Sequence, residues 1–292
     1  MSYFFVVNPN AGKKRGNIAE LIKGAFFAGK MRYEIEFTKA RGHARELAAK
    51  AVVEGFGNVV AVGGDGTIRE TASALVGKSQ ILGIIPCGSG NGLARNLYLP
   101  LDAGACARGC CEWPERVIDA GLANGELFLC AAGVGLDAEV ARDFNARKSG
   151  RGMLPYIYRG ALQFFKYRPV AMTAVFNSKR VEFAPLVAAV LNGRQYGGGA
   201  QIAPDACLDD GLLDLAIVKK AGFLKTLAAL PDLFNGALAS HPEIISYFKS
   251  RTFEFHLRKG TVYHLDGEDF VCDSGLLKIT VLPKALKVKA PL

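Results

Sequence analysis

The fold is decided by Val59-Val60-Ala61-Val62-Gly63-Gly64-Asp65-Gly66-Thr67, an apolar strand that runs directly into a glycine-rich turn. Three glycines remove the β-carbons that would keep backbone N–H groups away from phosphate oxygens, and they allow the positive φ angles of an anion-binding nest. Thr67 and Glu70 have the S/T-x-x-E spacing of a capping box, which predicts a helix that begins at Thr67. The positive end of that helix would point at a polyphosphate on the turn.

Asp65 is the one acid in this turn. A carboxylate next to an anion site repels phosphate unless a metal ion lies between them, or unless the acid orients or deprotonates a hydroxyl. The alternative is a tight turn without a ligand, as in many α/β proteins. The acid favours the ligand-binding interpretation.

The first hundred residues alternate strand patterns with helical periodicity. Strands are predicted over residues 3–7, 31–37, 58–62 and 81–85, and helices over 17–27, 43–54 and 67–76. This alternation predicts a doubly wound α/β domain with a mainly parallel sheet. Such sheets bind ligands at the carboxyl ends of their strands.

Strand patterns dominate the rest of the chain, which predicts a second, β-rich domain. We expect the α/β domain over residues 1–118 and the β-rich domain over 119–292, with the last strand a candidate to return to the first domain. Helices are predicted at 154–167 and 223–238. The expected strands cover 126–132, 170–176, 183–191, 212–218, 251–257, 261–265 and 277–282.

Composition narrows the class of protein. The chain has 292 residues, is half apolar and carries a formal charge of +9, and it contains no apolar stretch long enough to span a membrane and no secretory signal. These features indicate a soluble cytoplasmic protein. The seven cysteines are read as reduced, buried thiols, and neither they nor the four histidines have the spacing of a metal site.

Positive charge is concentrated at the N-terminus, where residues 1–50 contain ten Lys or Arg and four Glu. Such a region suits ATP phosphates or an anionic membrane surface. The aromatic residues of this stretch lie in apolar runs and not between the cations, which is evidence against a nucleic-acid partner.

Two further loops follow predicted strands. Residues 8–16 combine turn formers with Lys13, Lys14 and Arg15 but lack the spacing of a Walker A loop. Residues 86–96 place Ser89 and Asn91 among glycines, where both side chains can hydrogen-bond a ligand. A bound ligand explains three such loops at one edge of a sheet better than three unrelated turns do.

Acidic turns mark the second domain. Residues 207–214 suit either a Mg²⁺ site or an Asp-Gly hairpin, and the hairpin is favoured on these residues alone. Residues 266–269 pose the same choice with three acids among four residues. Carboxylates this crowded raise one another's pKa or bind a cation, which suits a general base or a metal-linked site.

In order and spacing, residues 8–12, 63–67, 86–91 and 266–268 resemble the signatures of the diacylglycerol kinase and sphingosine kinase superfamily. The resemblance covers nearly the whole chain. It implies an N-terminal α/β domain of the three-layer kind found in phosphofructokinase and NAD kinase, a C-terminal β-sandwich, and an active site in the cleft between them. It also implies transfer of the γ-phosphoryl group of ATP to a lipid hydroxyl.

The resemblance assigns roles to single residues. It implies Glu268 as proton acceptor, with Asp65 and Asp266 as the other functional carboxylates. It implies a Mg²⁺ held by Asp210 and by the backbone carbonyls of Cys207 and Leu212. The residues expected at the nucleotide are Asn8, Pro9, Asn10, Ala11, Gly12, Thr38, Gly63, Gly64, Asp65, Gly66, Thr67, Ile68, Arg69, Ser89 and Asn91.

Several alternatives stay open. Residues 89–92 are closer to the sphingosine and ceramide kinase pattern than to bacterial diacylglycerol kinases, so the lipid is either diacylglycerol or a sphingoid base or ceramide. The compact length favours a bacterial-type enzyme that acts peripherally at the membrane surface. An amphipathic segment over 153–165 is either an acyl-chain entrance or a core helix. NAD kinase and a non-catalytic nucleotide- or lipid-binding regulator are the alternative functions, and the oligomeric state is either a monomer or a homodimer.

Overall fold

The computed structural model describes residues 1–11, 20, 22, 24, 31–146, 160 and 162–291. Gly12, most of the predicted helix 17–27, most of the segment 153–165 and half of the predicted helix 154–167 lie outside these residues. The chain forms two compact units, which we call unit 1 (Met1–Ile118 with Lys284–Leu292) and unit 2 (Asp119–Pro283).

Unit 1 contains the predicted parallel sheet. Its strands run in the order β2, β1, β3 and β4, and each pairs in parallel with its neighbour. Their bounds are Arg32–Phe37, Ser2–Val7, Asn58–Gly63 and Ile81–Pro86. Lys287 and Val288 of β16 (Leu276–Lys289) then pair in parallel with β4. Strands β1, β3 and β4 are almost wholly buried, as their unbroken apolar runs predict, whereas the edge strand β2 is only partly buried.

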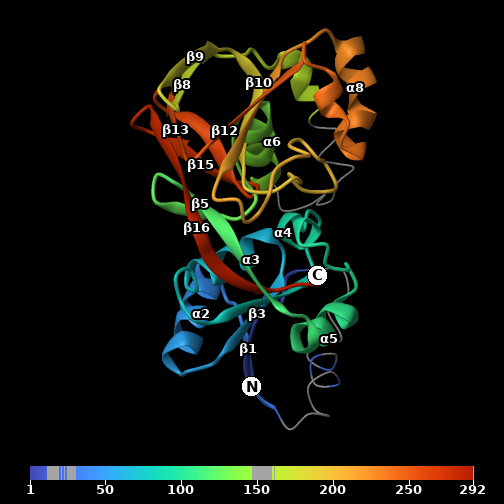
Figure 1. Ribbon diagram of the computed structural model, residues 1–292, viewed down its shortest axis with the longest axis vertical. Helices are drawn as coiled ribbons and strands as arrows, with labels where there is room; N and C mark the ends of the chain where they lie inside the picture. Colours follow the sequence, from blue (N-terminus) through green and yellow to red (C-terminus); the bar gives the residue numbers. More distant parts are fainter. Residues whose placement is uncertain are drawn as a thin grey trace. The chain divides into compact units, whose positions relative to one another are not determined.

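The helices of unit 1 include α2 (His43–Val53), α3 (Asp65–Ser73), α4 (Gly92–Asn96) and α5 (Ala103–Glu112). Figure 1 shows α2 and α5 on opposite sides of the strands. Asp102 caps α5 by accepting from the Ala105 N–H at 2.8 Å. Burial raises the pKa of Cys106 and Cys110 on this helix to about 12, which keeps both as thiols. Cys207, predicted to be buried, is exposed.

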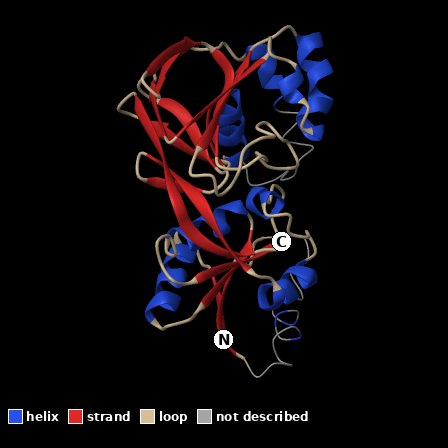
Figure 2. Cartoon of the chain, in the orientation of Figure 1, coloured by secondary structure: helices blue, strands red, loops and turns tan. Residues whose placement is uncertain are grey.

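Unit 2 is the predicted β-sandwich, and Figure 2 shows strands as its main component. One sheet is antiparallel, in the order β12, β11, β10, β7, β14 and β15. The bounds of these strands are Ile245–Ser250, Leu213–Lys219, Pro185–Leu191, Ala131–Gly135, Thr261–Leu265 and Glu268–Cys272. The other strands of unit 2 are β6 (Glu126–Phe128), β8 (Met172–Phe176), β9 (Lys179–Phe183) and β13 (Thr252–His256), together with the second part of β5 (Glu115–Ala123) and the first part of β16.

One hydrophobic core joins the strands of unit 2. It includes Phe128, Leu215, Phe253, Phe255 and Tyr263, which come from strands of both sets. The helices of the unit include α6 (Leu136–Asn145), α8 (Phe223–Asn235) and the short η2 (Leu238–Ser240). No helix among the described residues is long and apolar enough to cross a membrane.

One expected strand of unit 2 was wrong, and one of its helices was missed. The stretch 126–132 is not one strand: β6 ends at Phe128 and β7 begins at Ala131, and the N–H groups of Leu129, Cys130 and Ala131 donate to the carboxylate of Asp266. Helix α6 was not predicted. Its first turn follows Gly135, whose φ of 120° is rarely adopted by any residue other than glycine.

Candidate active site

Three loops of unit 1 meet at the carboxyl ends of β1, β3 and β4. The Asn8 N–H donates to Val62 O at 2.9 Å, and the Cys87 N–H donates to Gly63 O at 2.8 Å. The Asn8 amide also donates to Thr67 Oγ1 at 3.1 Å. The structure therefore brings together the three loops that the sequence singled out, at the edge where an α/β sheet binds its ligand.

The glycines let these loops touch one another. A β-carbon on Gly88 would lie 2.7 Å from Gly64 Cα, and one on Gly90 would lie 2.8 Å from Asp65 Oδ2. The expected positive φ angles were wrong: Gly63, Gly64 and Gly66 all have negative or extended φ, and Gly64 has φ of −90°. Close packing of backbones, and not a left-handed nest, is what requires glycine here.

The predicted capping box was also wrong. Helix α3 begins at Asp65 with Gly64 as its N-cap, two residues before Thr67. Glu70 instead accepts from the N–H groups of Gly42 at 2.7 Å and Ala44 at 3.2 Å, at the start of α2. Its charge favours the positive end of that neighbouring helix. The N-terminus of α3 still lies at the end of β3, where its first N–H groups suit a phosphate.

Asp65 holds the third loop in place. Its Oδ2 accepts from the Asn91 N–H at 2.8 Å, and its Oδ1 accepts from the Gly92 N–H at 2.6 Å. Asn91, in the left-handed conformation with φ of 52°, bonds Gly88 through both its Oδ1 and its Nδ2 at 2.9 Å. Asp65 and Asn91 therefore have structural partners, and their contact with a ligand stays a prediction.

The other expected nucleotide residues differ in accessibility. Pro9, Asn10 and Ser89 are exposed, and Asn8, Ala11, Thr38 and Gly66 are partly exposed. Thr38 joins the same edge because its N–H donates to Val7 O at 2.8 Å. Ile68 is 1 % exposed and Arg69 is 7 % exposed, so neither side chain presents a broad surface to a ligand.

The acidic turn of unit 2 at 266–269 is a two-residue hairpin between β14 and β15. Leu265 pairs with Glu268, and Asp266 and Gly267 both have positive φ, as a type I′ turn requires. The Asp266 carboxylate accepts the three N–H bonds that lead into β7, at 2.8 to 3.0 Å. Asp269 accepts from the Asn145 amide at 2.9 Å. Glu268, partly exposed, is the first residue of β15.

A polar cluster around His264 contacts this turn, and it was not predicted from the sequence. His264 Nδ1 accepts from the Gly267 N–H at 3.3 Å, and its Nε2 lies 2.9 Å from Asp137 Oδ2. The Tyr196 hydroxyl contacts both partners. A β-carbon on Gly133 would collide with all three side chains. No local spacing signals this cluster, because Asp137, Tyr196 and His264 come from distant parts of the chain.

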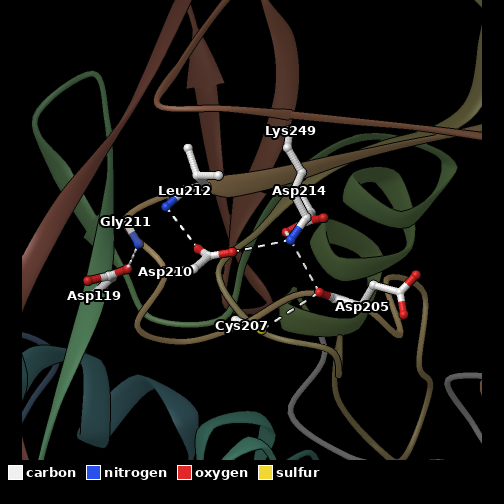
Figure 3. A network of polar contacts seen from close by, with 8 residues as sticks. All are labelled: Asp119, Asp205, Cys207, Asp210, Gly211, Leu212, Asp214 and Lys249. Carbon is white, nitrogen blue, oxygen red and sulfur yellow. Dashed lines mark hydrogen bonds and ion pairs between the residues drawn. The ribbon is translucent and has the colours of Figure 1, made fainter.

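The acidic turn at 207–214 is not the hairpin favoured from its residues, because no strand directly precedes it. Figure 3 shows its polar contacts. Asp210 Oδ1 accepts from the Leu212 N–H at 2.9 Å, and Asp119 Oδ2 accepts from the Gly211 N–H at 2.6 Å. The turn is thus fixed by carboxylates that accept backbone N–H groups.

Lys249 places a cation at this turn. Its Nζ lies 3.2 Å from Asp210 Oδ2, 3.5 Å from Asp214 Oδ2 and 3.2 Å from the Asp205 carbonyl oxygen. Burial raises the pKa of Asp214 to about 6 although Lys249 opposes this. The oxygen ligands expected from Asp210, Cys207 and Leu212 suit Mg²⁺ in chemical type. A bound ion would share Asp210 with Lys249, and the described residues contain no cluster of three His, Cys, Asp or Glu side chains that could hold a metal.

Comparison with known proteins agrees with this architecture. Residues 2–123 match the model of the diacylglycerol kinase catalytic domain, and residues 130–290 match that of the YegS C-terminal NAD kinase beta sandwich-like domain. A probable lipid kinase YegS-like of Pseudomonas aeruginosa is 32 % identical over 96 % of this chain and 92 % of its own. A diacylglycerol kinase of Mycobacterium tuberculosis is 33 % identical over 85 % and 81 %.

The fold is also found in a solved structure. The crystal structure of a putative diacylglycerol kinase from Bacillus anthracis superposes with a TM-score of 0.81 and covers 99 % of this chain and 96 % of the other, at 22 % identity. At that identity the likeness concerns the fold alone. The relatives and the two domain models together confirm the resemblance drawn from the sequence.

Proposed function

The chain belongs to the diacylglycerol kinase family and is a kinase, and from this premise we propose that it transfers the γ-phosphoryl group of Mg²⁺-ATP to a lipid hydroxyl. The observation that carries the proposal is the meeting of three loops at the carboxyl ends of β1, β3 and β4. Asn8, Thr67, Asp65 and Gly92 connect these loops by hydrogen bonds. Such an edge, with a helix N-terminus on it, is built to hold phosphates.

We assign nucleotide binding to residues 1–118. The exposed Asn10 and Ser89 and the partly exposed Asn8 and Thr38 would hydrogen-bond the nucleotide. Gly63, Gly64 and Gly66 would let its phosphates approach the first turn of α3. Mg²⁺, when bound with ATP, neutralises charge on the β- and γ-phosphates. The metal role of Cys207, Asp210 and Leu212 in unit 2 is a separate proposal that rests on the resemblance.

We assign the proton acceptor to Glu268, with Asp65 and Asp266 as supporting carboxylates. Asp266 already accepts three backbone N–H bonds and Asp65 accepts two. Because both carboxylates are already engaged by backbone N–H groups, they suit orientation and charge placement better than proton transfer. The hairpin held by Asp266 would present Glu268 to the acceptor hydroxyl.

The acceptor class is a lipid alcohol, either diacylglycerol or a sphingoid base or ceramide. Residues 89–92 resemble the sphingosine and ceramide kinase version of the third loop, whereas relatives of this chain include proteins named diacylglycerol kinase. A soluble kinase with a membrane lipid as acceptor would work in the cytoplasm and peripherally at the membrane surface.

The test is a transfer assay with a panel of acceptors. Purified protein is incubated with Mg²⁺ and γ-labelled ATP against diacylglycerol, sphingosine, ceramide, phosphatidylglycerol and NAD, and the products are separated by chromatography. Label in one lipid that is lost in the Glu268→Gln variant supports the proposal. Label only in NAD would make the protein an NAD kinase, and ATP binding without any labelled product would make it a regulator.

A further inference from the structure

Helix α8 exposes its apolar face. Phe223, Leu227, Leu230 and Phe234 follow one another at intervals of four, three and four residues, which places them on one side of the helix. Their exposed fractions are 43, 52, 39 and 40 %, and that of the adjacent Leu224 is 78 %. Ala229 is the one buried residue of the helix. A helix of a globular protein normally turns its apolar stripe to the core, and this one does not.

The exposed apolar surface extends beyond α8. The ring of Phe165, 59 % exposed, lies 4.9 Å from that of Phe223 between centroids. Phe164 beneath them is buried, and its centroid lies 6.1 Å from that of Phe223. We call Phe165 and the exposed apolar residues of α8 the α8 patch. A contiguous apolar patch with aromatic residues marks a surface that binds a partner or a membrane.

Cations lie in the segments around the α8 patch, and the acid of α8 itself, Asp232, is paired with His241 at 2.8 Å. Residues 219–230 contain Lys219, Lys220 and Lys225, and residues 162–168 contain Lys166 and Arg168, without one Asp or Glu. Lys166, Arg168, Lys219 and Lys225 are exposed. The Lys220 Nζ donates to the Tyr167 carbonyl oxygen at 2.7 Å and lies 5.2 Å from the centre of the Phe164 ring.

An apolar helical face with a cationic border is the pattern of helices that lie in the interface of an anionic bilayer. We propose that the α8 patch docks this protein on anionic lipid, with α8 in the interface and Lys225, Lys166 and Arg168 on the headgroups. The inference deepens the proposed function and rests on it, because the acceptor is taken to be a membrane lipid. A second copy of the chain fits less well, since a two-fold contact on this face would bring like-charged borders together.

The test is cosedimentation with vesicles. Wild-type protein is mixed with vesicles of phosphatidylcholine alone or with phosphatidylglycerol added, and compared with the double variant Leu224→Gln, Leu227→Gln. We expect wild type to bind the anionic vesicles, with affinity that falls as salt rises, and the double variant to bind at least about tenfold more weakly. Val53→Gln, which changes an apolar residue 87 % exposed on α2, is the matched control and should bind as wild type does.

The replaced leucines are exposed, so the thermal unfolding temperature of the double variant should match that of wild type. Equal vesicle binding by both proteins would overturn the inference, and so would a solution dimer that the double variant breaks.

Measuring lipid kinase activity on two forms of the substrate separates the docking inference from the proposed function. The double variant should phosphorylate a dispersed short-chain diacylglycerol at the wild-type rate and lose activity on vesicles. Patch-dependent vesicle binding without activity on any lipid would support docking and refute the kinase proposal.

Discussion

The carboxylate of Asp65 accepts the backbone N–H of Gly92 at 2.6 Å, so an acid that follows β3 fixes the first residue of the helix that follows β4. Two loops far apart in sequence are thereby made into one rigid edge. The acid in the glycine-rich turn therefore has a structural task beside any task in catalysis.

Replacing Asp65 by asparagine should abolish transfer while the protein stays folded. The amide can accept one of the two N–H bonds but presents an N–H group to the other, so we expect a loss of about 1 to 3 kcal/mol in unfolding free energy. Steady-state kinetics and denaturant unfolding measure both effects. Asp102→Asn, which makes the same change at the cap of α5, should retain activity. A nearly fully active Asp65→Asn enzyme would remove Asp65 from the mechanism.

Gly88→Ala should weaken ATP binding. Its new β-carbon would lie 2.7 Å from Gly64 Cα, and backbone on both sides leaves little room to adjust. We expect a loss of about 1 to 3 kcal/mol in stability and a raised KM for ATP. Gly57→Ala is the control, because no atom lies within 4 Å of the added carbon. Unchanged ATP binding in Gly88→Ala would mean that the contact of the loops does not shape the site.

His264 is expected to act as a positioning residue for the hairpin that carries Glu268. His264→Phe removes the acceptor for the Gly267 N–H, and we expect kcat to fall at least about tenfold with little change in the KM for ATP. His264→Asn should restore part of kcat, because its Oδ1 takes the place of Nδ1. Loss of stability without this rescue would assign His264 to packing alone. His256→Asn, at an exposed histidine, should be silent.

Lys249 is expected to compete with Mg²⁺ for Asp210. In Lys249→Gln the carboxylate loses its cation, so added Mg²⁺ should raise the unfolding temperature more than in wild type, as ligand linkage requires. Thermal unfolding across a Mg²⁺ titration measures the difference, with Ca²⁺ as a test of selectivity. Lys278→Gln serves as a control on another strand. Identical Mg²⁺ responses in Lys249→Gln and wild type would speak against a metal at this turn.

Asp214 should make stability depend on pH. The pKa of its carboxyl group rises from 3.8 to about 6 on folding. Between pH 3.8 and about 6, the folded state therefore holds a proton on Asp214 that the unfolded state has largely lost. Stability conferred by that proton is present below about pH 4 and is lost as the pH rises to about 6. Asp214→Asn should flatten this part of the profile in denaturant titrations at several pH values. A decline of equal size in the variant would assign it to other groups.

Local sequence patterns predict the sheet of unit 1 because an unbroken apolar strand and a helical repeat are properties of short segments. They do not predict partners far along the chain. Glu70 has the spacing of a cap for its own helix, yet it caps α2, and Asp266 interrupts the strand pattern of residues 129–131 from more than a hundred residues away. The cluster of Asp137, Tyr196 and His264 was missed for the same reason.

Strand β16 has a consequence for how the protein is made. Leu286, Val288 and Ala290 are buried, and Lys287 and Val288 pair with β4 of unit 1. These residues follow the whole of Asp119–Pro283 in the chain, so a ribosome releases them after unit 2 and β4 keeps an open edge until then. Nascent unit 1 would wait, with an unpaired strand that invites wrong partners, until unit 2 has been synthesised.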